Sequence, residues 1–176
     1  NTRDIFMTWD RRQGNYDDYL LNLCDLYVKS LIGLDKSAID FATDQVIKLK
    51  SERVYTYTRS RIKWHLSQGH KVIFISGSPD FLVKKMAEKY NNNVIFTLGK
   101  DGAVAYENGT IEFIPAMKVD AIETTGAGDS YIGAVSHSII EGKSLIEACK
   151  FATKCSAITV CRIGAQPSMP TLEDVE

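Results

Sequence analysis

Apolar side chains recur at three- and four-residue steps through roughly the first seventy residues, as they do on one face of an amphipathic helix. The period predicts helical structure over residues 5–32, with Asn15 as an N-cap. Two further helices are predicted over residues 37–49 and 54–68, and Gly69 ends the last of them. The N-terminal part of the chain is therefore predicted to be helical throughout.

The hydrophobic period changes sharply after Gly69. Residues 71–75 form a short, continuous apolar run of the kind found in buried parallel strands. A loop of small residues follows over 76–79, and a helical pattern over 80–90. Residues 94–98 form a second short apolar run, so we expect a right-handed βαβ unit with two parallel strands.

Turn-forming residues divide the following stretch into short strands, and two apolar helices come after them. The predicted elements are a turn over 99–102, a strand over 103–106, a tight turn at Asn108–Gly109, a strand over 111–115, a helix over 127–141 and a helix over 144–160 capped by Ser144. Together the elements predict an α/β fold of three layers. It has a mostly parallel sheet, helices on both faces, and a helical, cap-like segment at the N-terminus.

Composition narrows the class of protein. The chain has 176 residues, of which 44% are hydrophobic and 24% charged, with a net charge of −1. These values are typical of a globular protein in the cytoplasm and favour neither nucleic-acid binding nor a membrane surface. The four cysteines and three histidines lack metal-ligand spacing, which predicts buried free thiols and no metal held by the protein.

The strongest chemical signal is the run Glu123-Thr-Thr-Gly-Ala-Gly-Asp-Ser130, between a β-type and a helical pattern. Gly126 and Gly128 allow backbone conformations that aim successive N–H groups at one point, and the following helix adds its positive N-terminal end. Asp129 lies in the first turn of that helix. Amide donors beside a carboxylate can stabilise a phosphoryl group in transit and accept the proton of an attacking hydroxyl.

This run resembles the C-terminal signature of the PfkB/ribokinase family of sugar and nucleoside kinases, usually Asp-Thr-x-Gly-Ala-Gly-Asp-(Ser/Ala)-Phe. The resemblance implies that Gly126, Ala127 and Gly128 form an anion hole and that Asp129 is the catalytic base. Glu123 stands where Asp is usual, and Tyr131 where Phe is usual.

A second segment also resembles that family, in which a Thr-x-Gly-x-x-Gly pattern lies along the nucleotide. Thr97, Gly99 and Gly102 fit the pattern, although two ordinary hairpin turns would look similar. Thr153 falls near a position where the family often has Asn and is a candidate nucleotide contact. The resemblance implies ATP as the phosphoryl donor, with Mg²⁺ carried by its phosphates.

The first half resembles a different family, the phosphoserine-phosphatase-like branch of the haloacid dehalogenase (HAD) superfamily. The resemblance rests on Val54-Tyr55, Arg59, His65, the run 69–72 and the run 75–79. It implies that Ser76 binds a substrate phosphate. The Asp-x-Asp nucleophile motif of that family is absent from the whole sequence, and so is its paired acidic magnesium motif. The missing nucleophile favours an anion-binding remnant or a plain turn at Ser76 over a part of an active phosphatase.

We therefore expect a HAD-like segment over 1–92 fused near Asn91–Asn93 to a PfkB-like segment over 93–176. The chain begins without Met, from which we expect a piece of a longer protein. The leading functional hypothesis is an ATP-dependent kinase of a sugar-like substrate. The alternatives are a Mg²⁺-dependent HAD-type phosphomonoester hydrolase and a catalytically inactive chimeric domain. The expected partners are the sugar-like substrate and a nucleotide, with neither nucleic acid nor a membrane.

Overall fold

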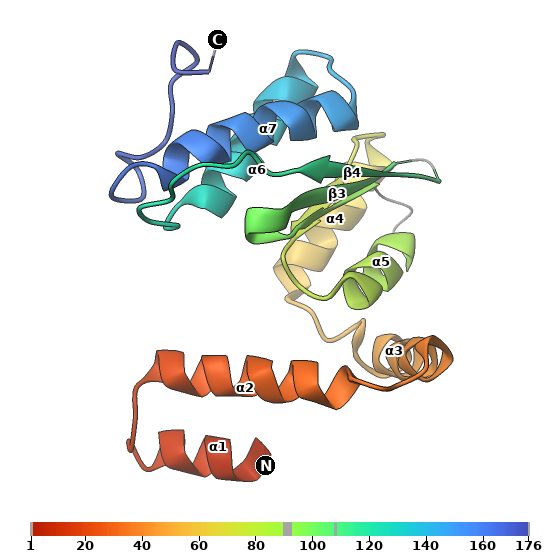
Figure 1. The fold of residues 1–176 in the computed structure, drawn as a ribbon. Helices are drawn as coiled ribbons and strands as arrows, with labels where there is room; N and C mark the ends of the chain where they lie inside the picture. The colour runs from red at the N-terminus through yellow and green to blue at the C-terminus, as the bar shows by residue number, and fades with distance from the viewer. Residues whose placement is uncertain (1, 90–92, 108, 176) are drawn as a thin grey trace. The chain divides into compact units, whose positions relative to one another are not determined.

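The computed structural model describes residues 2–89, 93–107 and 109–175 (Figure 1). The chain divides into two compact units, Asn1–Val46 and Ile47–Glu176. Each unit is described here by itself. The predicted segment boundary after residue 92 stays a prediction, and Asn91 and Asn92 at that junction lie outside the described residues.

The first unit is helical, as predicted. Helix α1 (Thr2–Asp10) and helix α2 (Tyr16–Leu31) pack as a hairpin in which the rings of Trp9 and Tyr19 stack with centroids 4.9 Å apart. Asn15 is the N-cap of α2, and its side chain accepts a hydrogen bond of 2.7 Å from the amide of Asp18. The single helical region predicted over 5–32 is instead broken, because Arg12 adopts a φ of 55° and Gly14 a φ of 138° between the two helices.

Helix α3 begins in the first unit, and the other elements belong to the second. Their bounds are α3 Lys36–Lys50, α4 Thr56–Ser67, β1 Ile73–Ser76, α5 Asp80–Lys89, β2 Asn93–Thr97, a 3₁₀ turn Gly99–Asp101, β3 Gly102–Glu107, β4 Thr110–Pro115, α6 Ala127–Ile140 and α7 Leu145–Val160. This order confirms the predicted succession of elements. None of the described helices combines the length and the apolar character needed to cross a membrane.

The sheet has the strand order β1-β2-β3-β4. Strands β1 and β2 are parallel, with Phe74 opposite Val94, which confirms the predicted parallel pairing across α5. The pairs β2–β3 and β3–β4 are antiparallel, as the predicted hairpin turn near Gly109 requires for β3 and β4. The expectation that the sheet is mostly parallel is wrong, because one of the three strand pairs that the structure describes is parallel. The physical reason is loop length: Glu107 lies opposite Thr110, and so short a connection can join only antiparallel neighbours.

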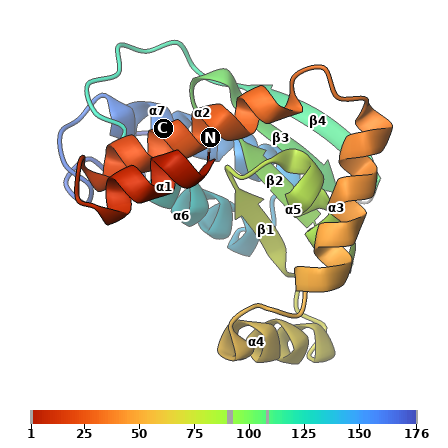
Figure 2. The same ribbon diagram turned by 90° about the horizontal axis from the view of Figure 1, so that it is seen from below.

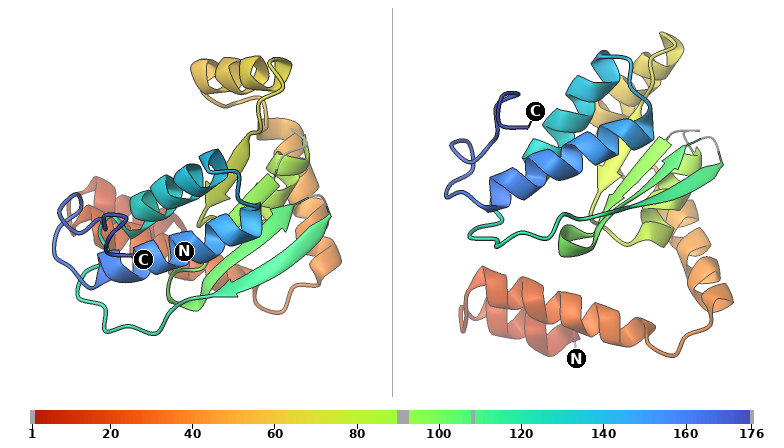
Figure 3. Two further views of the ribbon diagram at one scale, coloured as in Figure 1. Left: turned by 90° about the horizontal axis from the view of Figure 1, so that it is seen from above. Right: turned by 45° about the horizontal axis from the view of Figure 1, so that its top comes forward.

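Helices cover both faces of the sheet, as predicted. Alternate residues of β2 point to opposite sides, so Ile95 packs with Leu145 of α7 and Val135 of α6, while Val94 packs with Val83 of α5. Figures 2 and 3 show the same arrangement, with α6 and α7 together on one face of the sheet and α5 on the other. The α/β class and the three layers are thus confirmed.

The cysteines are all free thiols, as predicted, but they are not all buried. Cys149 and Cys155 lie in the core on α7, where burial raises the pKa of both thiols. Cys24 is exposed on α2, so the expectation of buried thiols is wrong there.

Gly102 and Gly133 offer a matched test of backbone packing. Gly102 has a φ of 112°, and a Cβ there would lie 2.1 Å from the carbonyl oxygen of Ile114 and 2.6 Å from the amide of Ala116. We expect Gly102→Ala to lower the free energy of unfolding by about 2 kcal/mol or more, because the β3–β4 pair must shift. Urea unfolding would measure the change.

Gly133→Ala is the control, because a Cβ at this mid-helix position of α6 has nothing within 4 Å. We expect it to raise the free energy of unfolding by roughly 0.5–1 kcal/mol through helix propensity. A Gly102→Ala protein as stable as the wild type would contradict the packing account.

Candidate active site at the N-terminus of helix α6

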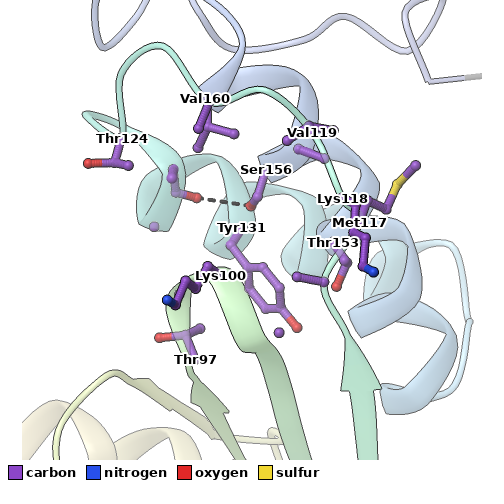
Figure 4. A pocket seen from close by; sticks show the side chains of 17 residues that line it. Thr97, Lys100, Met117, Lys118, Val119, Thr124, Tyr131, Thr153, Ser156 and Val160 are labelled. Atoms are coloured by element: carbon purple, nitrogen blue, oxygen red, sulfur yellow. Dashed lines mark hydrogen bonds between the residues drawn. The ribbon is translucent and has the colours of Figure 1, made fainter.

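A cavity of about 490 Å³ opens beside the first turn of α6 (Figure 4). Four parts of the second unit form its walls. They are the end of β2 with the 3₁₀ turn, the loop after β4, the first turns of α6, and the C-terminal half of α7. We call this cavity the α6 pocket.

The residues predicted to contact the nucleotide meet in the α6 pocket, although they lie far apart in the sequence. Thr97, Gly99 and Gly102 line it from the sheet side, and Thr153 lines it from α7. Two of the three residues predicted to form an anion hole, Ala127 and Gly128, also line it.

Gly126 is the N-cap of α6 and sets the direction of the helix. Its φ of 82° and ψ of −7° are left-handed, and a Cβ there would lie 3.1 Å from the carbonyl oxygen of Ala165. Both the conformation and the close approach favour glycine. Gly126 does not line the pocket itself, so its contribution is to shape the turn.

Hydrogen bonds at the start of α6 indicate which of its amides are available to an anion. The amide of Ala127 donates a 3.2 Å hydrogen bond to the carbonyl of Thr124, and the amide of Ser130 donates to the carbonyl of Gly126. The amides of Gly128 and Asp129 come before the helix supplies its own acceptors. These two amides, at the positive end of the helix, are the donors best suited to bind an anion.

Glu123 ties the turn before α6 to the loop after α7. Its carboxylate accepts a hydrogen bond of 2.9 Å from the amide of Gly164, and the amide of Ile122 donates to the carbonyl of Val160 at 2.7 Å. The hydroxyl of Thr125, and next the amide of Gly164, lower the pKa of Glu123 below its usual value. Sequence reasoning treated Glu123 only as a departure from a motif and missed this contact, which no local pattern signals.

Hydroxyl groups hold the first turn of α6 against α7. The hydroxyl of Ser156 donates to the carbonyl of Ala127 at 3.1 Å, the dashed line in Figure 4. The hydroxyl oxygens of Ser130 and Thr159, both buried, share a hydrogen bond of 2.9 Å. The two helices therefore position the turn together.

Asp129 is exposed in the first turn of α6 and does not line the α6 pocket. It lines a neighbouring cavity of about 220 Å³, together with His137 and Phe151. Gly128 lines the α6 pocket, and Asp129, the next residue, lines the smaller cavity. The two cavities therefore adjoin at the N-terminus of α6.

Two lysines that sequence reasoning missed, Lys100 and Lys118, line the α6 pocket (Figure 4). Lys100 lies inside the Thr97–Gly102 segment, and this position is the one sequence feature that could have indicated it. Lys118 lies in the irregular loop after β4, where no sequence pattern indicates a binding residue. Both add positive charge to the lining of the pocket.

Ser76 takes no part in either cavity. It ends β1, and its hydroxyl accepts a 3.1 Å hydrogen bond from the amide of Ser78. This contact is typical of a turn stabilised by a serine side chain.

The fold and the site together define an α/β protein with a pocket at a glycine-rich helix N-terminus. A family model described as "pfkB family carbohydrate kinase" matches residues 78–172, more than half of the chain. The chain therefore belongs to the pfkB family.

Its relatives include sugar kinases. A ribokinase of Schizosaccharomyces pombe is 50% identical over 84 residues, covering 47% of this chain and 26% of that protein. Fructokinase-1 of Zea mays is 35% identical over 108 residues, covering 57% of this chain and 33% of that protein. The chain thus spans between about a quarter and a third of these relatives' lengths.

Among solved structures, ribokinase of Arabidopsis thaliana complexed with ribose and ATP superposes with a TM-score of 0.54 at 23% identity. The superposition covers 65% of this chain and 49% of that one, and it supports the fold. We find no support for a phosphatase-like first half or for a fusion, and the family match already begins at residue 78.

The Glu123 contact predicts a pH-dependent stability. Because the pKa of Glu123 in the folded protein lies below the ordinary 4.5, the unfolded state takes up a proton first as the pH falls. The stabilisation is present above pH 4.5 and is lost as the pH falls through the lower pKa of the folded state. We expect Glu123→Gln to be less stable than the wild type at neutral pH, with a difference that shrinks in acid. Urea unfolding across this pH range would measure it.

Glu173→Gln, which changes an exposed carboxylate elsewhere in the chain, is the control and should leave stability near neutral pH unchanged. A stability difference between wild type and Glu123→Gln that stayed constant with pH would show that the carboxylate charge is not what holds the two loops together.

Proposed function

We propose that this chain carries the nucleotide-binding and phosphoryl-transfer part of a sugar kinase. It would bind ATP in the α6 pocket and transfer the γ-phosphoryl group to a hydroxyl of a sugar-like substrate. The observation that carries the proposal is that residues of two separate signature segments line one pocket beside a helix N-terminus. They are Thr97, Gly99 and Gly102 of the first segment, and Ala127 and Gly128 of the second. Relatives named ribokinase and fructokinase make ribose and fructose the first acceptors to test.

Charge in the pocket suits a nucleotide polyphosphate. The free amides of Gly128 and Asp129 and the positive end of α6 act at short range, while Lys100 and Lys118 add two mobile cations. A phosphoryl group in transit spreads negative charge over its oxygens, and such donors stabilise it. Mg²⁺ would arrive with the nucleotide, bound through phosphate oxygens and water, which are the ligands it usually keeps.

Asp129 has the position required of a general base. It is exposed and lies one residue after Gly128, so a hydroxyl approaching from the neighbouring cavity can reach the carboxylate next to the bound phosphates. Accepting that proton as the oxygen attacks phosphorus is the role we assign to Asp129.

The other two functional hypotheses have less support. The HAD-type hydrolase rests on Ser76, whose hydroxyl already accepts a hydrogen bond in a local turn. A domain that binds nucleotide without catalysing phosphoryl transfer must be distinguished from an active kinase, because the chain matches only part of its relatives. Binding and turnover are therefore tested separately.

Mg-ATP should stabilise the chain against heat. A ligand at one hundred times its dissociation constant adds about 2.7 kcal/mol, which corresponds to roughly 5–10 °C in Tm for a chain of this size. We expect Lys100→Ala to reduce this shift, because the variant removes a cation from the pocket. Differential scanning fluorimetry with and without Mg-ATP measures it.

Lys154→Ala, on the exposed side of α7 and outside the pocket, is the matched control and should keep the full shift. Absence of any shift in the wild type at millimolar nucleotide would refute the nucleotide site.

Asp129→Asn separates chemistry from binding. We expect phosphoryl transfer from ATP to ribose or fructose to fall by roughly 10²–10⁴-fold, the usual contribution of a general base, with the Kd for Mg-ATP unchanged. A coupled assay for ADP gives the rate, and calorimetry gives the Kd. Asp120→Asn, an exposed aspartate in the loop before α6, should leave both unchanged.

Turnover that survived Asp129→Asn would show that this carboxylate is not the base. Binding of Mg-ATP by the wild type without transfer to any sugar would leave the nucleotide site standing and favour the non-catalytic alternative.

A further inference from the structure

Tyr131 carries a buried hydroxyl that nothing in the fold satisfies. Its side chain is 6% exposed, and among the described residues the phenolic oxygen has no hydrogen-bond partner. Such groups are rare in native proteins, because burial removes water without replacing its hydrogen bonds.

The polar groups around Tyr131 do not explain the hydroxyl. Cys149 and Thr153 are close enough to influence the pKa of the phenol, but neither side chain makes a hydrogen bond of acceptable geometry with its oxygen. Burial, the largest cause, raises the pKa of Tyr131, so the group is a neutral phenol with a proton to donate.

Tyr131 lines the α6 pocket on the same helix as the amides suited to an anion. It follows Gly128 by three residues, which is about 4.5 Å along the helix axis. Figure 4 shows the ring extending from α6 into the space between the labelled Lys100 and Thr153. The hydroxyl therefore belongs to the wall that a ligand would meet after its phosphates reach the helix end.

The residues of the pocket indicate which part of a ligand the Tyr131 hydroxyl contacts. The free amides suited to phosphates lie at the first turn of α6, and Tyr131 follows them along the helix. Ala157 and Val160, which line the pocket from α7, are apolar. A neutral phenol beyond the helix end matches the nucleoside part of a nucleotide, with its ring nitrogens and oxygens, better than the polyphosphate.

We propose that the Tyr131 hydroxyl donates a hydrogen bond to an acceptor on the nucleoside of the bound nucleotide and thereby determines nucleotide affinity. This inference rests on the proposed function, since it names the contact within the same pocket. The hydroxyl stays unsatisfied in the free protein and is satisfied when the nucleotide binds.

Tyr131→Phe tests the contact. We expect the Kd for Mg-ATP to rise about three- to tenfold, the usual effect of one hydrogen bond, while the Kd for Mg-tripolyphosphate stays the same. The Tm without ligand should be unchanged or higher, because the variant removes an unsatisfied polar group. Titration calorimetry and thermal melts give both readouts.

Tyr106→Phe is the matched control. Tyr106 is partly buried on β3 and packs with Val94 and Phe96 on the opposite face of the sheet, outside the α6 pocket. Its substitution should leave the Kd of both ligands unchanged.

Three results would overturn the contact while leaving the nucleotide site intact. They are equal Mg-ATP affinity in wild type and Tyr131→Phe, an equal loss for tripolyphosphate, and a lower Tm of the free variant, which would reveal a structural hydrogen bond instead. A wild type that binds no Mg-ATP would overturn this contact and the proposed function together.

Discussion

The left-handed turn at Gly126 is the constraint on which the site depends. A Cβ at Gly126 would lie 3.1 Å from the carbonyl oxygen of Ala165, so the turn before α6 packs closely against the loop after α7. Glu123 fixes the same pair of loops through the amide of Gly164. The direction of α6, and with it the direction of its free amides, follows from these two contacts.

The sheet fixes the other wall of the site. Gly102 begins β3 with its backbone against that of Ile114 and Ala116, which leaves no room for a side chain. This close approach holds the start of the loop after β4 against the turn that carries Gly99 and Lys100. Two glycine contacts, one at each wall, thus determine the shape of the pocket between them.

Short-range signals made most of the fold predictable. Asn15 and Ser144 mark helix starts by their capping side chains, and the change from helical to continuous apolar spacing after Gly69 marks the first strand. The sheet direction was misjudged because apolar runs show burial but not pairing. Only the tight turn near Gly109 indicates how two strands pair, because so short a connection can join only antiparallel neighbours.

The site was predictable only where its chemistry is local. The run around Gly126–Asp129 indicates a helix N-terminus. Which amides are available there depends on the carbonyl of Thr124, which accepts a hydrogen bond from the Ala127 amide. The roles of Glu123 and Lys118 depend on loops distant in sequence or without periodicity, so no pattern in the residues reports them.

The two cavities at the helix end have unequal chemistry, and under the proposed function they would have different roles. The α6 pocket has amides, two lysines and the Tyr131 hydroxyl, which are groups suited to the parts of a nucleotide. The smaller cavity has Asp129 amid side chains such as Phe151, Met169 and Leu172. One carboxylate is enough to activate a hydroxyl, whereas distinguishing one sugar from another takes several hydrogen-bonding groups at fixed positions. Under the proposed function, these cavities would supply the nucleotide site and the general base, and selecting one sugar would take further hydrogen-bonding groups.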